Sequence, residues 1–493
     1  MNERIGQYGK YRFWEILPAT LIWSTLILSV ITSFLAPTIA IIFIIVFDLY
    51  WTLRVIYFII HIIFAYKTYR QNLKVDWMKE LKTIEGADEI VHLVMLPTYK
   101  EGVTILRAAL KSIVASTYAN DKFIIVLGGE EGDEKNFTSH AKKLEKEFGD
   151  KFRKFIVTLH PRGLPGEIPG KGSNLSWMAG KVRTYIDKEK IPYDKIIVSA
   201  FDIDTSPHPQ YFALLAKTVL TEEDPLRSSY QPVVVFSNNI WKAKVPVRVE
   251  SFGTTFWLFG ELVRPERLWT FSSHSMPWQM LVDVGYWEKD MVSEDSRIFL
   301  QGLLHYEGDY RVTPIFLPVS MDAVEGDNYL DTMKALYKQK RRWAWGVEHL
   351  PYMIGEFRKH PKMPKRVKAQ FLFNHIEGMY TWATAPILIF VLGYLPFFIA
   401  HDVPTAIIAN SPFTLEWMMR IATLGIFATG FLGLTLLPPR PGEVKPWHWI
   451  VMIFQWALLP FTFLIFGAIP AIDAQTRLAL GKYLGFDVTK KKG

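Results

Sequence analysis

Residues 196–204 read Ile-Ile-Val-Ser-Ala-Phe-Asp-Ile-Asp, a short apolar run that ends in two aspartates, Asp202 and Asp204, one residue apart. Apolar runs of this length, bounded by turn-forming segments, are typical of buried strands. Helical stretches separate this run from similar ones, and such alternation predicts βαβ units. The similar runs are Ile90–Leu96, Phe123–Leu127, Phe155–Leu159 and Val233–Phe236. We therefore predict an α/β domain with a mostly parallel sheet over residues 76–328.

The composition requires a large water-facing body, because 21% of the 493 residues are charged although half are hydrophobic. The formal net charge is +8. The basic residues form no long stripe and cluster beside apolar segments, where anionic lipid headgroups attract them. We therefore expect a lipid bilayer, and no nucleic acid, as a partner. The chain has no cysteine, which excludes disulfides, zinc–thiolate sites and thiol nucleophiles.

Long apolar segments flank the predicted domain on both sides. A membrane-spanning helix needs about 20 apolar residues. Two segments before the domain and three after it are candidates: Ile16–Leu35, Ile39–Tyr66, Gly378–Ala400, Ile421–Leu437 and Trp449–Ile472. The basic segment 67–74 follows the second candidate and places that end in the cytoplasm. We expect an integral, multi-pass protein of the plasma membrane with a cytosolic catalytic domain.

The chain divides into five predicted regions. They are an N-terminal membrane region with two helices, the cytosolic domain, amphipathic interfacial helices, a C-terminal membrane region with about three helices, and a basic tail. Their bounds are 1–75, 76–328, 329–370, 371–472 and 473–493. Five spans would leave the tail outside the cell, whereas its basic residues favour the cytosol. Either the run around Pro460 is re-entrant, or one span is miscounted.

Asp202 and Asp204 are candidate metal ligands. Because the chain turns at the end of a strand, two carboxylates one residue apart can approach one divalent cation. Hard carboxylate oxygens suit Mg²⁺ or Mn²⁺, which would stabilise a diphosphate as leaving group. Open α/β sheets bind ligands at the carboxyl ends of their strands. Pro97, Tyr99 and Glu101 also follow a predicted strand, although an ordinary strand-to-helix turn explains them when they are taken alone.

Gly170-Lys171-Gly172-Ser173-Asn174 opens a helix after a loop rich in glycine and proline, residues 161–169. A P-loop requires four residues between its glycines and Ser or Thr directly after its lysine. Neither condition holds, which disfavours a nucleoside triphosphatase. What remains is a lysine with free amides at a helix N-terminus, a combination that suits an anion.

Two further segments have both a structural and a chemical explanation. In Ser293-Glu294-Asp295, Ser293 fits a helix N-cap and the acids suit the helix dipole. Alternatively, a carboxylate here accepts the proton of an attacking hydroxyl. The basic helical stretch with Gln339-Lys340-Arg341-Arg342-Trp343 fits a membrane surface. Alternatively, its arginine offsets diphosphate charge and its indole stacks on a sugar ring.

In this order and spacing, the motifs resemble those of membrane-bound, inverting family 2 glycosyltransferases. That group contains cellulose, chitin and hyaluronan synthases and ceramide glucosyltransferases. The resemblance runs from Val91 to Trp343, and the Gln-x-x-Arg-Trp motif at 339–343 is its strongest element. It implies a GT-A type α/β domain that binds a nucleotide sugar on a mixed, mostly parallel sheet, flanked by transmembrane helices.

The resemblance also implies roles for individual residues. Asp202 and Asp204 would hold the cation and the donor diphosphate, and Asp295, preceded by Glu294, would be the general base. The donor would contact several segments: Pro97, Tyr99, Glu101, Glu130, Lys171, Asn174 and Asp202. The acceptor and diphosphate side would be lined by Gln339, Arg342 and Trp343.

Two stretches depart from the family pattern. The family usually has an aspartate pair after the second strand that contacts the nucleobase, whereas this chain has Glu130-Glu131. The longer side chains leave the base contact, and the identity of the base, open. Residues 272–276, Ser-Ser-His-Ser-Met, lack the usual small-residue and arginine pattern. His274 is accordingly either a substrate contact or a packed histidine.

We expect transfer of a hexose-type sugar from a nucleotide-sugar donor to a growing polysaccharide, with inversion at the anomeric carbon. Transfer of a single sugar to a lipid acceptor is the alternative, because both kinds of enzyme share the motifs. A transporter or receptor with a nucleotide-binding domain would place Asp48, Arg54 and His61 along a membrane path. A cytosol-end position or helix pairing explains these three residues more simply. The oligomeric state stays open.

Overall fold

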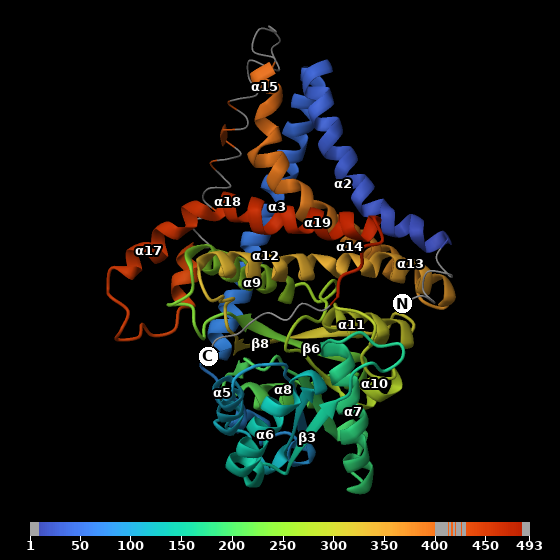
Figure 1. The fold of residues 1–493 in the computed structure, drawn as a ribbon, viewed down its shortest axis with the longest axis vertical. Helices are drawn as coiled ribbons and strands as arrows, with labels where there is room; N and C mark the ends of the chain where they lie inside the picture. The colour runs from blue at the N-terminus through green and yellow to red at the C-terminus, as the bar shows by residue number, and fades with distance from the viewer. Residues whose placement is uncertain are drawn as a thin grey trace.

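The computed structural model describes residues 9–399, 413, 416, 417, 420, 425 and 430–485. Figure 1 shows three tiers: an α/β domain below, a tier of crosswise helices above it, and a column of long helices on top. The column and the crosswise tier combine segments from before and after the α/β domain. The long apolar segments that precede and follow the domain in the sequence therefore lie together on one side of it.

The α/β domain contains one eight-stranded sheet. Its strands are β1 (Val91–Pro97), β2 (Phe123–Glu130), β3 (Lys154–His160), β4 (Ile196–Ala200), β5 (Ser206–Pro207), β6 (Ser228–Val235), β7 (Ser275–Pro277) and β8 (Arg311–Ser320). The order across the sheet is β3-β2-β1-β4-β7-β6-β8-β5. Strand β1 pairs in parallel with β2 and β4, β2 with β3, and β6 with β8. Strand β7 runs antiparallel to β4 and β6, and β5 to β8. The sheet is thus mixed and mostly parallel, which confirms the predicted fold class.

Helices cover both faces of this sheet. The α-helices are α4 (Trp77–Leu81), α5 (Val103–Val114), α6 (Glu134–Phe148), α7 (Lys171–Lys188), α8 (Tyr211–Thr221), α9 (Val245–Leu262), α10 (Trp278–Asp283) and α11 (Glu294–His305). Short 3₁₀ turns are η1 (Ala87–Glu89), η2 (Asn120–Lys122), η3 (Glu131–Asp133), η4 (Gly149–Lys151), η5 (Tyr193–Lys195) and η6 (Pro225–Arg227). Strands β1 and β2 are buried almost throughout, as expected for parallel strands between two helical layers.

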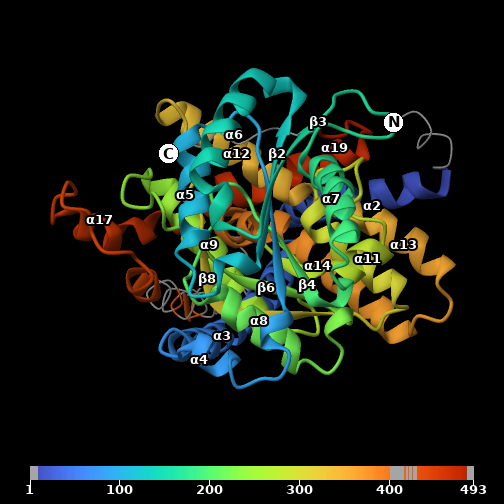
Figure 2. The same cartoon turned by 90° about the horizontal axis from the view of Figure 1, so that it is seen from below.

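Two glycines of β2 show how closely the helices approach. An added Cβ would meet Met178 of α7 at Gly128 and Phe137 of α6 at Gly129. Successive residues of a strand point to opposite faces, so α7 lies on one face and α6 on the other. Figure 2 shows this arrangement from below. Because β1, β2 and β4 are parallel, their carboxyl ends meet at one edge of the sheet.

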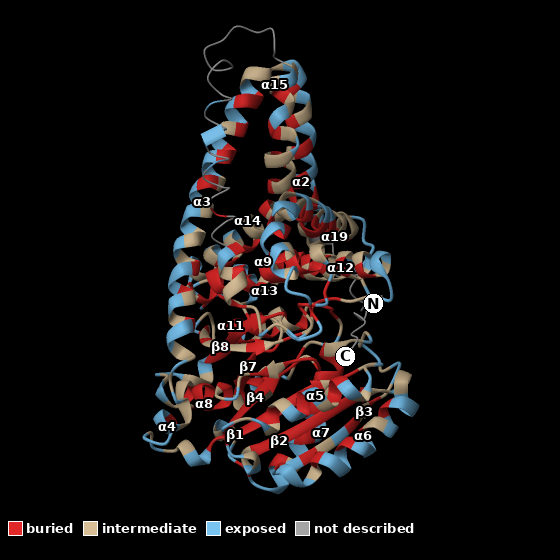
Figure 3. Ribbon diagram, turned by 90° about the vertical axis from the view of Figure 1, so that its left-hand side faces the viewer, coloured by how far each residue is buried: buried red, intermediate tan, exposed pale blue. Residues whose placement is uncertain are grey.

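The column consists of α2 (Gly9–Leu35), α3 (Pro37–Asn72), α14 (Lys365–Phe390), η8 (Leu392–Tyr394) and α15 (Leu395–Ile399). Helix α3 begins at a proline, which loses no helical hydrogen bond at that position. Large apolar side chains of α2 and α3 are exposed: Leu28, Phe34, Leu53 and Phe64 are each more than half exposed. Many residues of both helices are pale blue, for exposed, in Figure 3. Among the described residues, three helices are long and apolar enough to cross a membrane, and α14 with α15, bent by 47°, forms a fourth candidate.

The crosswise tier lies between the column and the domain. It contains α12 (Tyr329–Ala344), η7 (Trp345–Glu348), α13 (His349–Lys359), α17 (His448–Phe454), η9 (Gln455–Leu458), α18 (Leu459–Thr462), the π-helical η10 (Phe463–Ala468) and α19 (Ile469–Ala479). The predicted span Trp449–Ile472 falls on α17 to α19. This segment is long and apolar enough to cross a membrane, yet it runs crosswise to α2 and α3 (Figure 1). It packs against α12 and α2.

Arg12 of α2 holds the last turn of α19. Its guanidinium donates to the backbone oxygens of Leu478, at 2.9 Å, and of Ala479. Carbonyls at a helix C-terminus have no partner within the helix. The hydroxyl of Tyr483 donates to both oxygens of Glu15, at 2.9 and 3.0 Å. Helices α2 and α19 are thereby fastened together.

Residues 421–424 and 426–429 of the predicted span Ile421–Leu437 lie outside the described residues, as do residues 486–493 of the basic tail. Within that span, Gly433 lies against Trp456 and Phe256 of α9, at the level of the crosswise tier. Ile399, by contrast, ends α15 at the top of the column (Figure 1).

Two of the three polar residues of α3 named above, Arg54 and His61, have local partners, whereas Oδ1 of the buried Asp48 has no hydrogen-bond partner among the described residues. Arg54 forms an ion pair with Glu377 of α14, and the hydroxyl of Tyr50 donates to the same carboxylate at 2.8 Å. His61 Nδ1 lies 2.7 Å from the backbone oxygen of Tyr57. Pairing between helices therefore accounts for Arg54, and a contact within α3 for His61.

Candidate active site

Asp202 follows β4 at the carboxyl edge of the sheet, and two neighbours hold its carboxylate. Oδ1 lies 2.7 Å from Nζ of Lys171, and Oδ2 accepts a hydrogen bond from Ser272 Oγ at 2.6 Å. The side chain is 24% exposed, so it borders solvent. The sequence singled out Asp202 and Lys171, whereas Ser272 stood out only as part of the stretch 272–276 that departs from the family pattern.

Lys171, the first residue of α7, joins two carboxylates. Besides Asp202, its Nζ contacts the two oxygens of Asp295 at 2.8 and 3.1 Å. Burial opposes the charged form of a lysine, but the charges of Asp202 and Asp295 outweigh burial and raise the pKa of Lys171. The ammonium is therefore a fixed positive charge between the two carboxylates.

Asp295 and Glu294 begin α11 but lie in different surroundings. Asp295 is 24% exposed, whereas Glu294 is 3% exposed. Glu294 packs against Gly172 of α7: a Cβ added at Gly172 would lie 3.0 Å from the Cβ of Glu294. Burial and the charge of Asp295 raise the pKa of Glu294. Ser293 stands at the N-cap position, but its side chain makes no capping hydrogen bond, so the predicted cap is wrong in that respect.

Asp204 points to a different neighbour. It is 5% exposed, and its Oδ2 accepts a hydrogen bond from the backbone amide of Asp322 at 3.1 Å. Among the described residues, no three His, Cys, Asp or Glu side chains form a group able to hold a metal. Two carboxylates one residue apart do suit a hard divalent cation whose other ligands are diphosphate oxygens and water. The residues present thus fit a cation that arrives with a diphosphate.

The loop after β1 is shaped by Glu101. Its Oε2 accepts hydrogen bonds from Thr98 Oγ1 at 2.7 Å and from the amide of Tyr99 at 2.5 Å. The amide of Lys100, which has a positive φ of 69°, donates to Asp133 at 3.0 Å. Glu101 therefore holds the loop that carries Pro97 and Tyr99 beside the end of β2.

Glu130 ends β2 and contacts a histidine that the sequence did not single out. Its Oε2 lies 2.9 Å from Nδ1 of His160, and His160 Nε2 lies 2.9 Å from Glu167. Ionised carboxylates only accept, so both ring nitrogens carry hydrogen. Burial opposes this charged ring, but the hydrogen bonds and charges of Glu130 and Glu167 outweigh burial and raise the pKa of His160. Lys289 completes the group at 2.9 Å from Glu167.

Two residues that the sequence suggested as substrate contacts are buried. Asn174 is 2% exposed and donates to the backbone oxygen of Gly128 at 3.3 Å. His274 is fully buried, its Nδ1 donates to Phe271 O at 2.8 Å, and the same nitrogen lies 3.7 Å from Asp295. Burial lowers the pKa of His274, so the ring is neutral. This environment matches the packed-histidine explanation.

The Gln339–Trp343 motif lies on α12. Lys340 pairs with Glu250 of α9 at 2.7 Å, and Arg341 with Asp473 of α19 at 3.1 Å. The ring of Trp343 is 6.4 Å from that of Phe236, directly after β6. Burial and the charge of Asp295 raise the pKa of Glu294, and the positive charge of Arg342 on α12 acts in the opposite direction with a smaller effect. Gln339 is half-buried on the same helix. The motif therefore ties the crosswise tier to the domain.

The chain is a glycosyltransferase of the class that uses a nucleotide-sugar donor. The chain belongs to a known family of such enzymes, because the family model described as glycosyl transferase family group 2 matches residues 197–471, more than half of its length. The enzyme class and the GT-A type fold expected from the sequence are thereby confirmed.

Solved structures of other glycosyltransferases are similar to the chain. The mannosyltransferase PcManGT from Pyrobaculum calidifontis, in complex with GDP-Man and Mn²⁺, has a TM-score of 0.43 and 16% identity, over 79% of this chain and 98% of its own. Residues 1–349 of S. aureus TarS, in complex with UDP-GlcNAc, have a TM-score of 0.37 and 12% identity, over 81% of this chain and 94% of their own. No curated protein matches the sequence.

Proposed function

We propose that this protein is a membrane-integrated, inverting glycosyltransferase that transfers a hexose-type sugar from a nucleoside-diphosphate sugar to a growing polysaccharide. The observation that carries the proposal is the ammonium of Lys171, 2.7 Å from Asp202 and 2.8 Å from Asp295. This charge lies between a carboxylate suited to the donor side and a carboxylate suited to the acceptor side. A diphosphate and an acceptor hydroxyl can therefore meet next to it.

The reaction we propose is a single displacement. The oxygen of the acceptor hydroxyl forms a bond to the anomeric carbon, and its proton passes to Asp295. The bond between the anomeric carbon and the diphosphate oxygen breaks, and its electron pair leaves with the nucleoside diphosphate. One displacement inverts the anomeric centre, so an α-linked donor gives a β-linked product.

Positive charge would stabilise the leaving diphosphate. Lys171 supplies a buried ammonium, and Arg342 supplies a planar guanidinium that suits phosphate oxygens. Asp202 and Asp204 would hold a divalent cation, Mg²⁺ or Mn²⁺, which supplies further positive charge when bound. Glu294, whose raised pKa favours the neutral carboxyl, would add no negative charge beside Asp295.

The remaining predicted residues would bind the two substrates. We place the nucleobase at the loop with Pro97 and Tyr99, which Glu101 shapes, next to Glu130, whose side chain is 13% exposed. Asn174 would hold the end of β2 in place beside this loop, through its hydrogen bond to the backbone oxygen of Gly128. Gln339 and Trp343 would face the acceptor.

The membrane arrangement belongs to the same proposal. Helices α2, α3 and α14 with α15 would span the plasma membrane, and the catalytic domain would lie in the cytosol. The outward apolar side chains of α2 and α3 support this placement, as do Lys67, Arg70 and Lys74 at the end of α3 nearest the domain. The crosswise helices would lie at the membrane surface, where an acceptor can reach the site.

Asp295→Asn tests the proposed base. The substitution removes the proton acceptor but keeps the size of the side chain, so UDP and GDP affinity should change little while turnover falls by about 100-fold or more. A screen of nucleotide sugars with purified membranes identifies the donor for this assay. Normal turnover in the variant would contradict the assignment.

The length of the product distinguishes the two acceptors. With a labelled donor, long chains support polysaccharide synthesis. A product that carries one sugar on a lipid would instead identify a lipid glycosyltransferase.

A further inference from the structure

A buried group of polar side chains lies next to Asp295 and has no part in the proposed reaction. Ser296 and Arg297 belong to α11, whereas His349 begins α13 in the crosswise tier. His349 is 1% exposed and Arg297 is 4% exposed. Burying polar groups is costly unless they bond to one another. The hydrogen bonds among these side chains therefore show which helices the group links.

Both ring nitrogens of His349 bond to α11. Nδ1 lies 3.2 Å from Nε and 3.2 Å from Nη2 of Arg297, and Nε2 lies 2.7 Å from Ser296 Oγ. A guanidinium donates but cannot accept, so Nδ1 is the acceptor and the hydrogen of the ring is on Nε2. Burial and the charge of Arg297 keep the pKa of His349 well below its usual range. The neutral ring with hydrogen on Nε2 is thus a rigid link.

Arg297 is itself fixed on two further sides. Its Nη1 donates to Glu288 Oε2 at 2.6 Å, and its guanidinium lies 3.6 Å from the centre of the Tyr352 ring. Tyr352 follows His349 by three residues on α13, so the two side chains share one face of that helix. Helix α13 therefore holds α11 through two adjacent contacts.

These contacts act on the first turn of α11, where Asp295 lies. Ser296 Oγ is also 3.2 Å from the backbone oxygen of Ser293, and Thr270 Oγ1 donates to the backbone oxygen of Asp295 at 2.6 Å. Ser293 makes no capping hydrogen bond with its side chain. The position of this turn consequently depends on its tertiary contacts.

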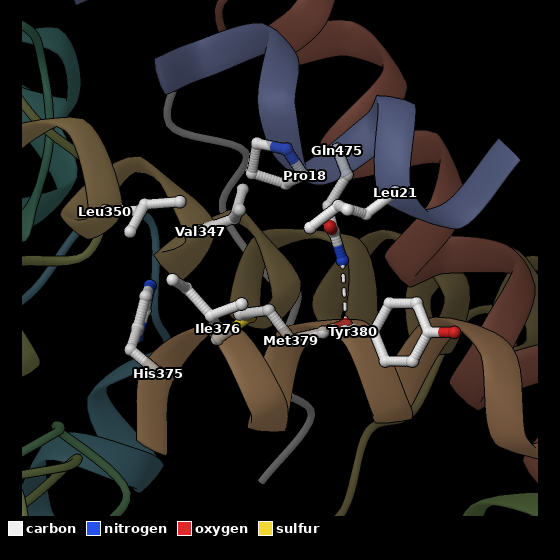
Figure 4. Close-up of a pocket in the computed structure, with 9 residues that line it drawn as sticks. All are labelled: Pro18, Leu21, Val347, Leu350, His375, Ile376, Met379, Tyr380 and Gln475. Atoms are coloured by element: carbon white, nitrogen blue, oxygen red, sulfur yellow. Dashed lines mark hydrogen bonds between the residues drawn. The ribbon is translucent and has the colours of Figure 1, made fainter. Parts of the chain in front are cut away.

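The link continues toward the column. The ring of Trp269 lies 5.7 Å from that of His349 and is stacked on His375 of α14 at 5.5 Å. His375 lines a small cavity between α2, α13, α14 and α19, which Figure 4 shows together with Pro18 and Gln475. Packed side chains therefore join the surroundings of Asp295 to the membrane-like helices.

We propose that His349 is a positioning residue for the transfer reaction. It fixes the first turn of α11 to α13, and thereby holds the Asp295 carboxylate at a fixed position relative to the crosswise tier. This inference rests on the proposed function, because it concerns the step in which Asp295 takes the proton of the acceptor.

Four variants of the full-length protein test the role of His349: His349→Ala, His349→Gln, Ser296→Ala and the double variant with alanine at both positions. His349→Ala should lower kcat by about 10- to 100-fold, the cost of a small misplacement of a reacting group, while affinity for UDP and GDP stays within about twofold. Ser296→Ala should lower kcat as well, and the double variant should be no slower than His349→Ala, because both remove one shared interaction. Glutamine offers one acceptor and one donor, so His349→Gln should recover most of the loss.

His92→Ala is the matched control. His92 is also fully buried, but it lies at the start of β1, away from the carboxyl edge. This variant should lose thermal stability and keep its kcat per folded molecule. The same behaviour in His349→Ala would overturn the inference. Asp295→Asn, measured in parallel, separates the two proposals: full turnover in that variant overturns the proposed function. An inactive Asp295→Asn beside a fully active His349→Ala overturns only the role of His349.

Discussion

Lys171 serves two acids at once. Its ammonium contacts Asp202 and Asp295, and without it two carboxylates would face the same small space. Attraction to one shared ammonium offsets the repulsion between two neighbouring carboxylates. We therefore expect Lys171 to hold Asp202 and Asp295 side by side, in the positions that the proposed cation site and the proposed base require.

Lys171→Met tests this role by keeping an unbranched stem and removing the charge. We expect turnover to fall by about 100-fold, the cost typical of removing a group that stabilises developing negative charge, and affinity for UDP and GDP to weaken. Donor turnover and titration calorimetry measure the two effects. Lys181→Met, on the same helix with its ammonium 4.4 Å from the ring centre of Trp177, is the control and should change neither. Equal turnover in both variants would exclude the proposed role.

The His160 group predicts a pH-dependent stability. The pKa of His160 is raised in the folded protein, so its contribution is fully present below the unfolded value of about 6.5 and is lost as pH rises through the folded value. His160→Gln should therefore be less stable than the parent by about 1–3 kcal/mol in acid, with a smaller difference in alkali. Thermal unfolding of both proteins over a pH series checks this. A difference that does not vary with pH would contradict it.

At this scale the family motifs singled out Lys171, Asp202 and Asp295, and the structure brings these three side chains together. The sequence could not predict the roles of Ser272 and His160. Their roles depend on partners that distant segments supply, and no local pattern marks them. Hydrogen bonding also explains why Asn174 turned inward, since the backbone oxygen of Gly128 is its partner.

Among the elements, the predicted strands were those with continuous apolar runs. Strand β7 has only three residues and is held by its pairs with β4 and β6, so its own sequence carries little signal. Strand β8 contains Pro314 and Pro318, and prolines argue against a strand when only the sequence is known. Both strands obtain their stability from neighbours rather than from composition.

The contact between α7 and α11 gives a prediction at the scale of elements. An added Cβ at Gly172 would lie 2.7 Å from the backbone oxygen of Glu288, which cannot move as a side chain can. Gly172→Ala should therefore destabilise the protein by about 1–3 kcal/mol and reduce turnover by moving α7 away from Asp295. Thermal unfolding and donor turnover measure these effects.

Gly180→Ala is the control for that substitution. Gly180 lies in the same helix, and nothing lies within 4 Å of an added Cβ. Alanine is preferred to glycine inside a helix, so this variant should be more stable by about 0.5–1 kcal/mol. A destabilised Gly180→Ala would show that α7 tolerates no side chain at either position.

For the whole molecule, the crosswise direction of α17 to α19 bears on the side of the membrane where the tail lies. Sequence alone could identify residues 449–472 as an apolar segment, but it could not show that the segment runs crosswise, because this segment is as apolar as the other candidate spans. Gly433 lies at the level of the crosswise tier and Ile399 at the top of the column. We infer that the tail returns to the side of the catalytic domain.

The absence of cysteine makes this inference testable. Single-cysteine variants Ala36→Cys, Lys74→Cys and Lys482→Cys place one thiol at the α2–α3 turn, after α3 and after α19. We expect an impermeant maleimide to label the first variant in intact cells, and the other two only after permeabilisation. Labelling of Lys482→Cys in intact cells would place the tail outside and make α17 to α19 a true span.

The hydrogen bonds from Arg12 to the end of α19 have a consequence for biosynthesis. The two partners are separated by 466 positions, and ribosomes add about 5–20 residues per second. Helix α2 therefore emerges roughly 25 to 90 s before its partner exists. During that interval the face of α2 that will receive α19 needs another cover, either lipid or a chaperone. Assembly of the upper tiers is thus a late event of translation, because α19 is among the last helices of the chain to be made.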